Sequence, residues 1–223
     1  MIISDCFCVY SGHQAELQGV SLHAGEDVRI CSELSNVPIP SVKKLYLKNF
    51  NDRLRCVNWK FIWCNRAPLK VQFFAWLLAK ERLPTKHNLI KKGIVSSATC
   101  DICNLEVEDG SHFCLNCPFA QGFWEAIGLS PRIHMVTDMA NLKPDGNLPE
   151  LHFRVFYLLC FWSSWNHRHD VVFRNMSPSL QSVLRKCMEE CGLWLERLKF
   201  EHRSVITSWK LIFSAPLQTL TNV

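Results

Sequence analysis

Apolar residues recur at three- and four-residue intervals along much of this chain, a spacing typical of helices that pack on a core. Pro68 stands where the first residue of a helix belongs. That helix should end before Pro84, because the residue that precedes a proline disfavours helical geometry. Its apolar positions are Val71, Phe73, Phe74, Leu77 and Leu78. Two shorter helical elements are predicted upstream, one over residues 41–49, which Ser41 can cap, and one over residues 59–63.

The helical pattern continues on both sides of a cysteine-rich stretch. Thr85 suits the N-cap of a helix over the sequence KHNLIKK, and Gly93 suits its end. The positions of this helix that can face inward are Leu89 and Ile90. Pro118 can begin another helix that runs through Ala126. The positions expected to be buried there are Phe119, Phe123, Trp124 and Ile127.

Beyond residue 150 the pattern predicts two long helices that form a hairpin. Residues 151–173 are apolar over most of their length, so this helix should be largely buried. Ser177 and Pro178 are a strong start signal for the second helix, which should reach about Phe200. Residues 206–213 extend it or form a last turn, and the chain after Pro216 is expected to fray. The predicted fold class is all-α.

These patterns divide the chain into five segments. Glycines, prolines and a lack of apolar periodicity make the beginning of the chain an irregular segment, and three prolines with Gly146 make residues 130–150 a linker. The predicted segments are an irregular N-terminal part (1–40), a small helical domain (41–129), the linker (130–150), a C-terminal helical region (151–213) and a frayed tail (214–223).

The stretch from Thr99 to Pro118 carries the most specific chemical signal in the sequence. Cys100 and Cys103 are separated by two residues, and His112 and Cys117 are separated by four. A short C-x2-C turn brings two thiolates to one side of a tetrahedral zinc ion, and a second pair closes the other side. Four protein ligands leave no open position for water, so the predicted zinc site is structural.

Spacing alone leaves the ligand set open. Cys114 and Cys117 also form a C-x2-C pair, so an all-cysteine site with Cys100 and Cys103 is chemically reasonable. In that alternative His112 is a bystander.

Charge is distributed unevenly along the chain. Between Ser41 and Lys92 the sequence has thirteen Lys or Arg and two acids, a net charge of +11, whereas the remainder has a net charge of −6. A concentrated positive field can hold phosphate groups, which indicates RNA or DNA as a partner. The alternative is an ordinary solvated helical surface. The candidate phosphate-binding residues next to the cysteine stretch are Arg82, Lys86, Lys91 and Lys92.

Composition indicates the cellular compartment of the protein and excludes some classes of partner. Hydrophobic residues at 48% are ample for a core, and twelve cysteines without a secreted disulfide pattern favour a reducing interior. We find no signal-peptide pattern and no apolar run long enough to span a membrane. We therefore expect an intracellular protein of the nucleus or cytoplasm that is not secreted and has no membrane partner.

The order of motifs around the cysteine stretch resembles a known family. The segments WKFIW at 59–63, PLKV at 68–71 and FAWL at 74–77 are followed by LPT at 83–85, the cysteines and Phe123-Trp124. This order is similar to the zinc-binding domain found downstream of reverse transcriptase in plant LINE-type (non-LTR) retrotransposons. The resemblance covers about residues 42–129. The segment WNHRHDVVF at 165–173 is similar to the W-x2-R-N-x3-F segment that often follows, with His169 in place of asparagine.

The resemblance implies a ligand set. The family pattern has C-x2-C, then an acidic residue and threonine, His-Leu-Phe and a last cysteine. Carried onto this sequence, its ligands are Cys100, Cys103, His112 and Cys117, and Cys114 takes a position that is usually apolar. The residues at 109–111, Asp-Gly-Ser, depart from the usual Glu-Thr-x.

The other cysteines and histidines are interpreted as core or surface residues and not as catalytic or metal-binding groups. Cys187 and Cys191 are four apart on a predicted helix, a spacing typical of packing, and His167 and His169 are expected at the surface. The sequence has no Tyr-x-Asp-Asp pair for polymerisation and no patterned acids for a nuclease, so we expect no enzyme and no small-molecule substrate.

The sequence thus predicts a retrotransposon-derived zinc-binding protein that binds RNA or DNA without sequence preference and lacks polymerase activity. The alternative is a protein-interaction or residual structural domain with no nucleic-acid role, for which the sequence indicates no partner.

Overall fold

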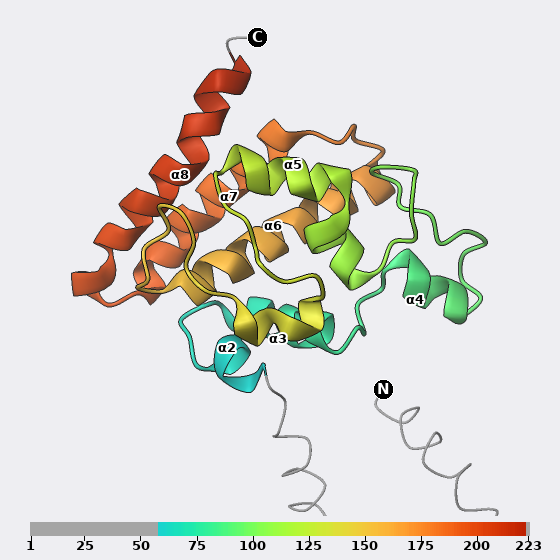
Figure 1. Ribbon diagram of the computed structural model, residues 1–223, viewed down its shortest axis with the longest axis horizontal. Helices are drawn as coiled ribbons and strands as arrows, with labels where there is room; N and C mark the ends of the chain where they lie inside the picture. Colours follow the sequence, from blue (N-terminus) through green and yellow to red (C-terminus); the bar gives the residue numbers. More distant parts are fainter. Residues whose placement is uncertain (1–57, 222–223) are drawn as a thin grey trace, which may run out of the picture. The chain divides into compact units, whose positions relative to one another are not determined.

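The computed structural model describes residues 58–221, and every regular element in that range is helical. The α-helices are α2 (Trp59–Trp63), α3 (Leu69–Ala79), α4 (Lys86–Lys91), α5 (Pro118–Ala126), α6 (Phe153–Arg174), α7 (Leu180–Trp194) and α8 (Ser204–Thr221) (Figure 1). The π-helical turn η5 (His112–Asn116) and the 3-10 turns η6 (Val136–Asn141), η7 (Leu195–Arg197) and η8 (Phe200–His202) complete the set. Residues 58–221 contain no β-strand, so the all-α prediction is confirmed for them.

Helix α6 is the centre of the core. Its residues 155–161 are all buried, which is the behaviour of a helix surrounded by others, because a helix at the surface keeps one polar face. Figure 1 shows α3 below α6, α5 above it and α8 to its left. The sequence pattern at 151–173 therefore predicted this helix and its burial correctly.

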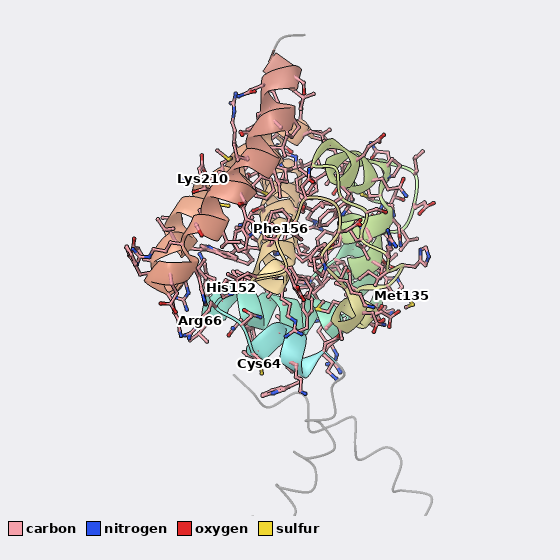
Figure 2. The ribbon with its side chains drawn as sticks, turned by 60° about the vertical axis from the view of Figure 1, so that its left-hand side comes forward. Cys64, Arg66, Met135, His152, Phe156 and Lys210 are labelled. Atoms are coloured by element: carbon pink, nitrogen blue, oxygen red, sulfur yellow. The ribbon has the colours of Figure 1, made fainter. Side chains whose placement is uncertain are left out.

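Aromatic side chains fill the spaces around α6. Phe74 of α3 packs edge-on against Trp162, with ring centroids 5.4 Å apart. Trp124 of α5 lies 5.8 Å from Phe161. Phe156 stacks on Phe213 of α8 at 5.1 Å, and Figure 2 labels Phe156 in the middle of the view, beside α8. Large rings from three helices thus pack on one central helix.

Most predicted helix boundaries agree with the structure, but α7 differs at both ends and residues 206–213 belong to a third long helix, α8. Helix α5 spans the predicted residues, and Gly93 ends α4 in the left-handed region with φ of 66°. Helix α7 begins at Leu180 after an N-cap at Ser179, later than expected, and ends at Trp194. The expected frayed tail is wrong as far as Thr221, because α8 continues through Pro216.

The division into separate segments is not visible in the packing. Buried residues from Phe61 to Phe213 form one continuous cluster. The expected linker contributes Val136 and Met139, both fully buried in η6. The predicted helix at 41–49 and the irregular segment 1–40 lie outside the described residues.

Candidate metal centre

The first half of the cysteine stretch folds into a tight knuckle. Thr99 and Val107 form an isolated antiparallel bridge, and the Cys100 N–H donates to the Glu106 carbonyl at 2.8 Å. The Asn104 N–H donates back to the Cys100 carbonyl at 2.9 Å, and Asn104 adopts a left-handed φ of 56°, which asparagine tolerates. This turn presents the Cys100 and Cys103 sulfurs on the same side.

The second half is a π-helical turn that leads into α5. The Asp109 carboxylate accepts the His112 N–H at 2.7 Å and so satisfies a donor at the start of the turn. The Cys117 N–H donates to the His112 carbonyl at 2.7 Å, an i to i−5 bond. This wide turn, of the type often found at functional sites, brings His112 and Cys117 to the same side of the backbone.

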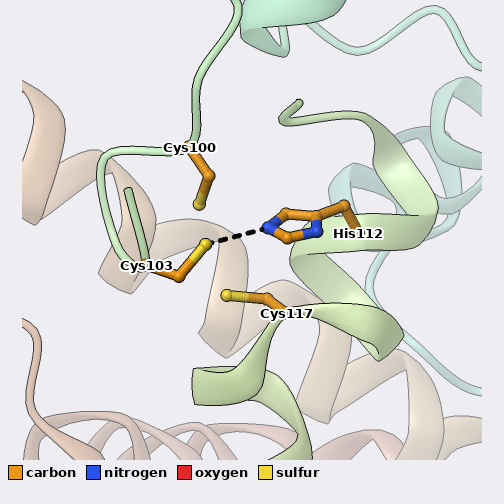
Figure 3. Close-up of side chains that lie close together, drawn as sticks. All are labelled: Cys100, Cys103, His112 and Cys117. Carbon is orange, nitrogen blue, oxygen red and sulfur yellow. Dashed lines mark hydrogen bonds between the residues drawn. The ribbon is translucent and has the colours of Figure 1, made fainter. Parts of the chain in front are cut away.

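The two halves bring four side chains together. The ligand atoms of Cys100, Cys103, His112 and Cys117 all lie within 4.8 Å of one another, and the Cys103 Sγ is 3.3 Å from the His112 Nε2 (Figure 3). Cys103 is half-buried and the other three are buried. The residues that the resemblance implied as ligands are therefore the residues that cluster.

Cys114 does not take part in this cluster. Its side chain is buried in the main hydrophobic core, where burial raises the pKa of the thiol well above its usual range. Its carbonyl accepts a hydrogen bond from the Trp124 indole at 2.8 Å. Cys114 thus behaves as the small apolar residue that the family pattern has at this position.

The cluster has the chemistry of a structural zinc site. Zinc binds thiolates at about 2.3 Å and imidazole nitrogen at about 2.0–2.1 Å, so the ligand atoms of a tetrahedral site lie about 3–4 Å apart. The 4.8 Å limit on the observed separations is close to this spacing. A hydrogen bond with Cys117 raises the pKa of Cys100 to about 12, and the same bond lowers the pKa of Cys117. Hydrogen bonding to Cys100 raises the pKa of His112 to about 9. The four groups are thus close enough to share protons.

An acidic residue lies behind the histidine. The Glu106 Oε2 is 3.3 Å from the His112 Nδ1, close enough for electrostatic attraction although the pair lacks hydrogen-bond geometry. Carboxylates in this position orient metal-bound imidazoles in many sites. Glu106 therefore favours the ring orientation that turns the His112 Nε2 towards the cysteines.

A second acid of the loop is fully buried and connects three elements. The Glu108 carboxylate accepts two hydrogen bonds from the Arg168 guanidinium of α6, at 2.7 and 3.2 Å. It also accepts the Lys86 N–H at 3.0 Å, and the Glu108 carbonyl accepts the His87 N–H. Thr85 occupies the predicted N-cap position of α4, but its hydroxyl makes no cap bond. The cysteine loop itself therefore caps α4.

The four candidate phosphate-binding residues lie beside this loop in two different environments. Arg82, Lys91 and Lys92 are exposed, and no acidic side chain within residues 58–221 pairs with them. Lys86 instead forms an ion pair with Asp101 of the knuckle, and its side chain is 17% exposed. Lys86 is thus positioned to attach α4 to the loop. Leu89 and Ile90 of α4 were expected to face inward. Leu89 is half-buried and Ile90 is exposed, so neither is buried in the core.

The sequence did not predict two features of the histidines: the burial of His167 and the contact between His152 and His202. His167 is fully buried and not at the surface as expected, because Phe119 stacks on its ring and its Nε2 accepts the Ser179 N–H at 3.1 Å. His152 and His202 contact each other at 3.0 Å. His152 and Arg66, both labelled in Figure 2, line a cleft of about 870 Å³. Fifty residues separate the two histidines, so no local pattern signals their contact.

Part of this chain is similar in sequence to known proteins. A putative ribonuclease H protein of Arabidopsis thaliana is 21% identical over 119 residues, which are 50% of this chain and 19% of that protein. The chain therefore spans less than a fifth of the length of this relative. No solved structure matches the chain. Among the described residues, no helix combines the length and apolar character needed to cross a bilayer. Residues 41–124 match the family described as zinc-binding in reverse transcriptase, which confirms for that segment the resemblance to a reverse-transcriptase zinc-binding domain.

Proposed function

We propose that this chain is a retrotransposon-derived module in which a structural zinc ion stabilises a surface that binds RNA or DNA through phosphate groups. In this proposal Cys100, Cys103, His112 and Cys117 are the ligands, and the chain acts by binding and has no polymerase activity. When bound, zinc supplies a rigid tetrahedral crosslink within the loop, and such binding is coupled to folding.

The observation that supports the proposal is positive charge next to the cysteine loop that no acidic side chain within residues 58–221 pairs with. Residues 58–92 contain eight Lys or Arg and one acid, Glu81. Arg82 lies before α4, and Lys91 and Lys92 lie at its end, all three exposed. Exposed cations without partners can neutralise phosphates, and each such contact releases counterions, so binding should weaken as salt increases.

The loop determines where these cations lie. Helix α4 has six residues and no buried side chain, so burial of apolar surface contributes little to its stability. Its first turn is instead attached to the loop by Glu108 and by the Lys86–Asp101 ion pair. A loop that loses its fold would therefore release α4 and disperse the charges.

The test is a salt series of RNA and DNA binding to zinc-loaded protein, followed by fluorescence anisotropy. We expect the double variant Lys91→Ala/Lys92→Ala to bind more weakly and to reduce the slope of log K against log salt by about 2. Lys143→Ala, which removes an exposed lysine from the connection between η6 and α6, is the matched control and should change little. Absence of binding to either nucleic acid at low salt would refute the proposal.

The second candidate is a protein-interaction domain. Exposed apolar side chains beside the same loop motivate it, since Ile94 is 63% and Leu105 72% exposed. Under this alternative the lysine variants would leave nucleic-acid affinity unchanged, and Leu105→Ser would abolish self-association or capture of a partner.

A further inference from the structure

The solvent-facing side of α3 has an unusual composition. Six residues of the buried side, among them Phe74 and Leu78, attach this helix to α6 and η6. The residues that are not buried, including the C-cap, are Leu69, Lys70, Phe73, Trp76, Leu77 and Lys80. Successive residues turn by about 100° in an α-helix, so these six share one side about 120° wide. We call this side the α3 outer face.

The α3 outer face exposes more apolar surface than packing within residues 58–221 accounts for. Leu69 is 72% exposed and Phe73 is 52% exposed. A surface helix normally presents polar residues to water, and a contiguous exposed apolar patch is characteristic of a binding site. The helix is apolar on both sides. On the outer side Trp76 and Leu77 are half-buried and pack in part against the core, whereas Leu69 and Phe73 are exposed.

Two aromatic rings on this face are arranged as a stack. Phe73 and Trp76, one helical turn apart, have ring centroids 5.6 Å apart and an angle of 29° between their planes. Each ring restricts the rotation of the other, so a flat ligand that stacks on them meets a surface that is already ordered. Such preorganisation lowers the entropy lost on binding.

Lysines flank the stack along the helix. Lys70 and Lys80 lie about 15 Å apart at the helical rise of about 1.5 Å per residue, one on each side of the rings. Lys70 is held with its ammonium 5.4 Å from the centre of the Trp162 ring. Helix α3 itself contains no acidic residue, and exposed Arg82 follows Lys80 on the way to α4. The face thus combines flat rings with positive charge at both ends.

We propose that the α3 outer face stacks unpaired bases of single-stranded RNA or DNA on Phe73 and Trp76, with Lys70 and Lys80 contacting the flanking phosphates. This inference rests on the proposed nucleic-acid function and specifies its substrate. Rings with flanking cations recognise single strands, because every unpaired base offers a flat face whereas a duplex hides its bases. The flanking lysines favour a polyanion over an apolar protein partner.

The experiment compares a short poly(U) oligonucleotide with a duplex of equal length, each bound by the zinc-loaded full chain and followed by anisotropy. We expect Phe73→Ala to weaken poly(U) binding about tenfold and to change duplex binding less than about twofold, since stacking on one ring is typically worth that much. Phe73 is half exposed, so its removal should leave zinc content and thermal stability unchanged. Trp76→Phe keeps a ring and should retain most of the affinity.

Matched controls separate ring stacking from general hydrophobicity. Phe200→Ala removes an 85% exposed ring that lies elsewhere beside Arg203, and Leu69→Ala removes exposed apolar surface from the α3 outer face without removing a ring. Both should bind poly(U) like the parent protein.

Equal poly(U) affinity of the Phe73→Ala and Phe200→Ala proteins would overturn the inference while the proposed function stands, provided the parent binds nucleic acid. Loss of self-association in sedimentation, with poly(U) affinity unchanged, would also overturn it and would identify a protein-docking face. If the parent protein binds neither nucleic acid at low salt, the proposed function fails as well.

Discussion

At the scale of single residues, Arg168 connects the long helix α6 to the cysteine loop. Its guanidinium lies 5.1 Å from the Trp165 ring centre and 5.8 Å from that of Phe173. It pairs with Glu108, and both side chains are almost completely buried. The W-x2-R-x4-F spacing at 165–173 thus places an arginine between two rings and directs it to the cysteine loop.

Removing one member of this pair should strongly destabilise the protein. Arg168→Met leaves the Glu108 carboxylate buried without its cation, and we expect a loss of about 3–5 kcal/mol in the free energy of unfolding. Urea denaturation of zinc-loaded protein measures this loss. The double variant Glu108→Gln/Arg168→Met should lose less than the sum of the two single variants, because no unpaired charge remains. Additive losses would mean that the two residues do not act as a pair.

The metal ligands can be assigned by single substitutions. His112→Ala should lower the zinc content well below one ion per chain, since it removes one of four converging donors. Cys114→Ala should keep the zinc and lose only about 1 kcal/mol of stability, because that thiol is a small core group. Elemental analysis of purified protein measures the zinc. Zinc loss in the Cys114→Ala protein alone would show that the assignment of His112 is wrong.

At the scale of elements, His167 joins three helices. Its ring stacks on Phe119 of α5 at 5.4 Å, and its Nε2 accepts the N–H of Ser179, the N-cap of α7. Burial lowers the pKa of His167 below its ordinary value of 6.5. Among the charged neighbours, Asp170 opposes this shift and Lys186 adds to it. The start of α7 therefore depends on a histidine that must stay neutral.

This dependence predicts a pH effect of known sign. The unfolded chain takes up a proton at His167 near pH 6.5, before the folded protein does, so stability should decline as pH falls through that range. Gln in place of His167 can accept the Ser179 N–H without titrating. Urea denaturation with zinc present, between about pH 7.5 and 6, should show a shallower decline for His167→Gln than for the parent. Parallel declines would show that His167 does not carry this effect.

At the scale of the whole described unit, the matched family segment and the C-terminal helices share one core. Phe74 of α3 packs on Trp162 and Trp165 of α6, and α5 contacts α7. The boundary expected near residue 129 therefore lies inside a continuous hydrophobic cluster. The Cys100, Cys103, His112 and Cys117 cluster lies in the cysteine loop, whereas α6 lies at the centre of the core.

A fragment that ends at residue 129 should consequently not form the same compact structure. Loss of α6 exposes Phe74 and Trp124, so we expect the fragment to bind hydrophobic dyes and to aggregate even when zinc is present. Size-exclusion chromatography and dye fluorescence provide the measurement, with the full chain as control. A monomeric fragment with sharp, dispersed NMR signals would show that residues 41–129 fold independently.

The sequence by itself determined what depends on near neighbours. Pro68, Pro118 and Gly93 mark helix ends through their own backbone preferences. The four clustered candidate ligands lie within eighteen residues, so short turns suffice to bring them together. The family resemblance separated His112 from Cys114, which spacing could not do.

Only the tertiary structure decided what depends on distant neighbours. Arg168 and Glu108 are sixty residues apart, His167 is buried by Phe119 and α7, and Lys86 is paired by a turn of the knuckle. Phe73 and Phe74 are adjacent and chemically identical, yet Phe74 is buried against α6 and Phe73 is exposed to water. Burial arises from the packing of segments far apart in the chain, so a local pattern can identify a helix without showing which of its apolar residues stays exposed.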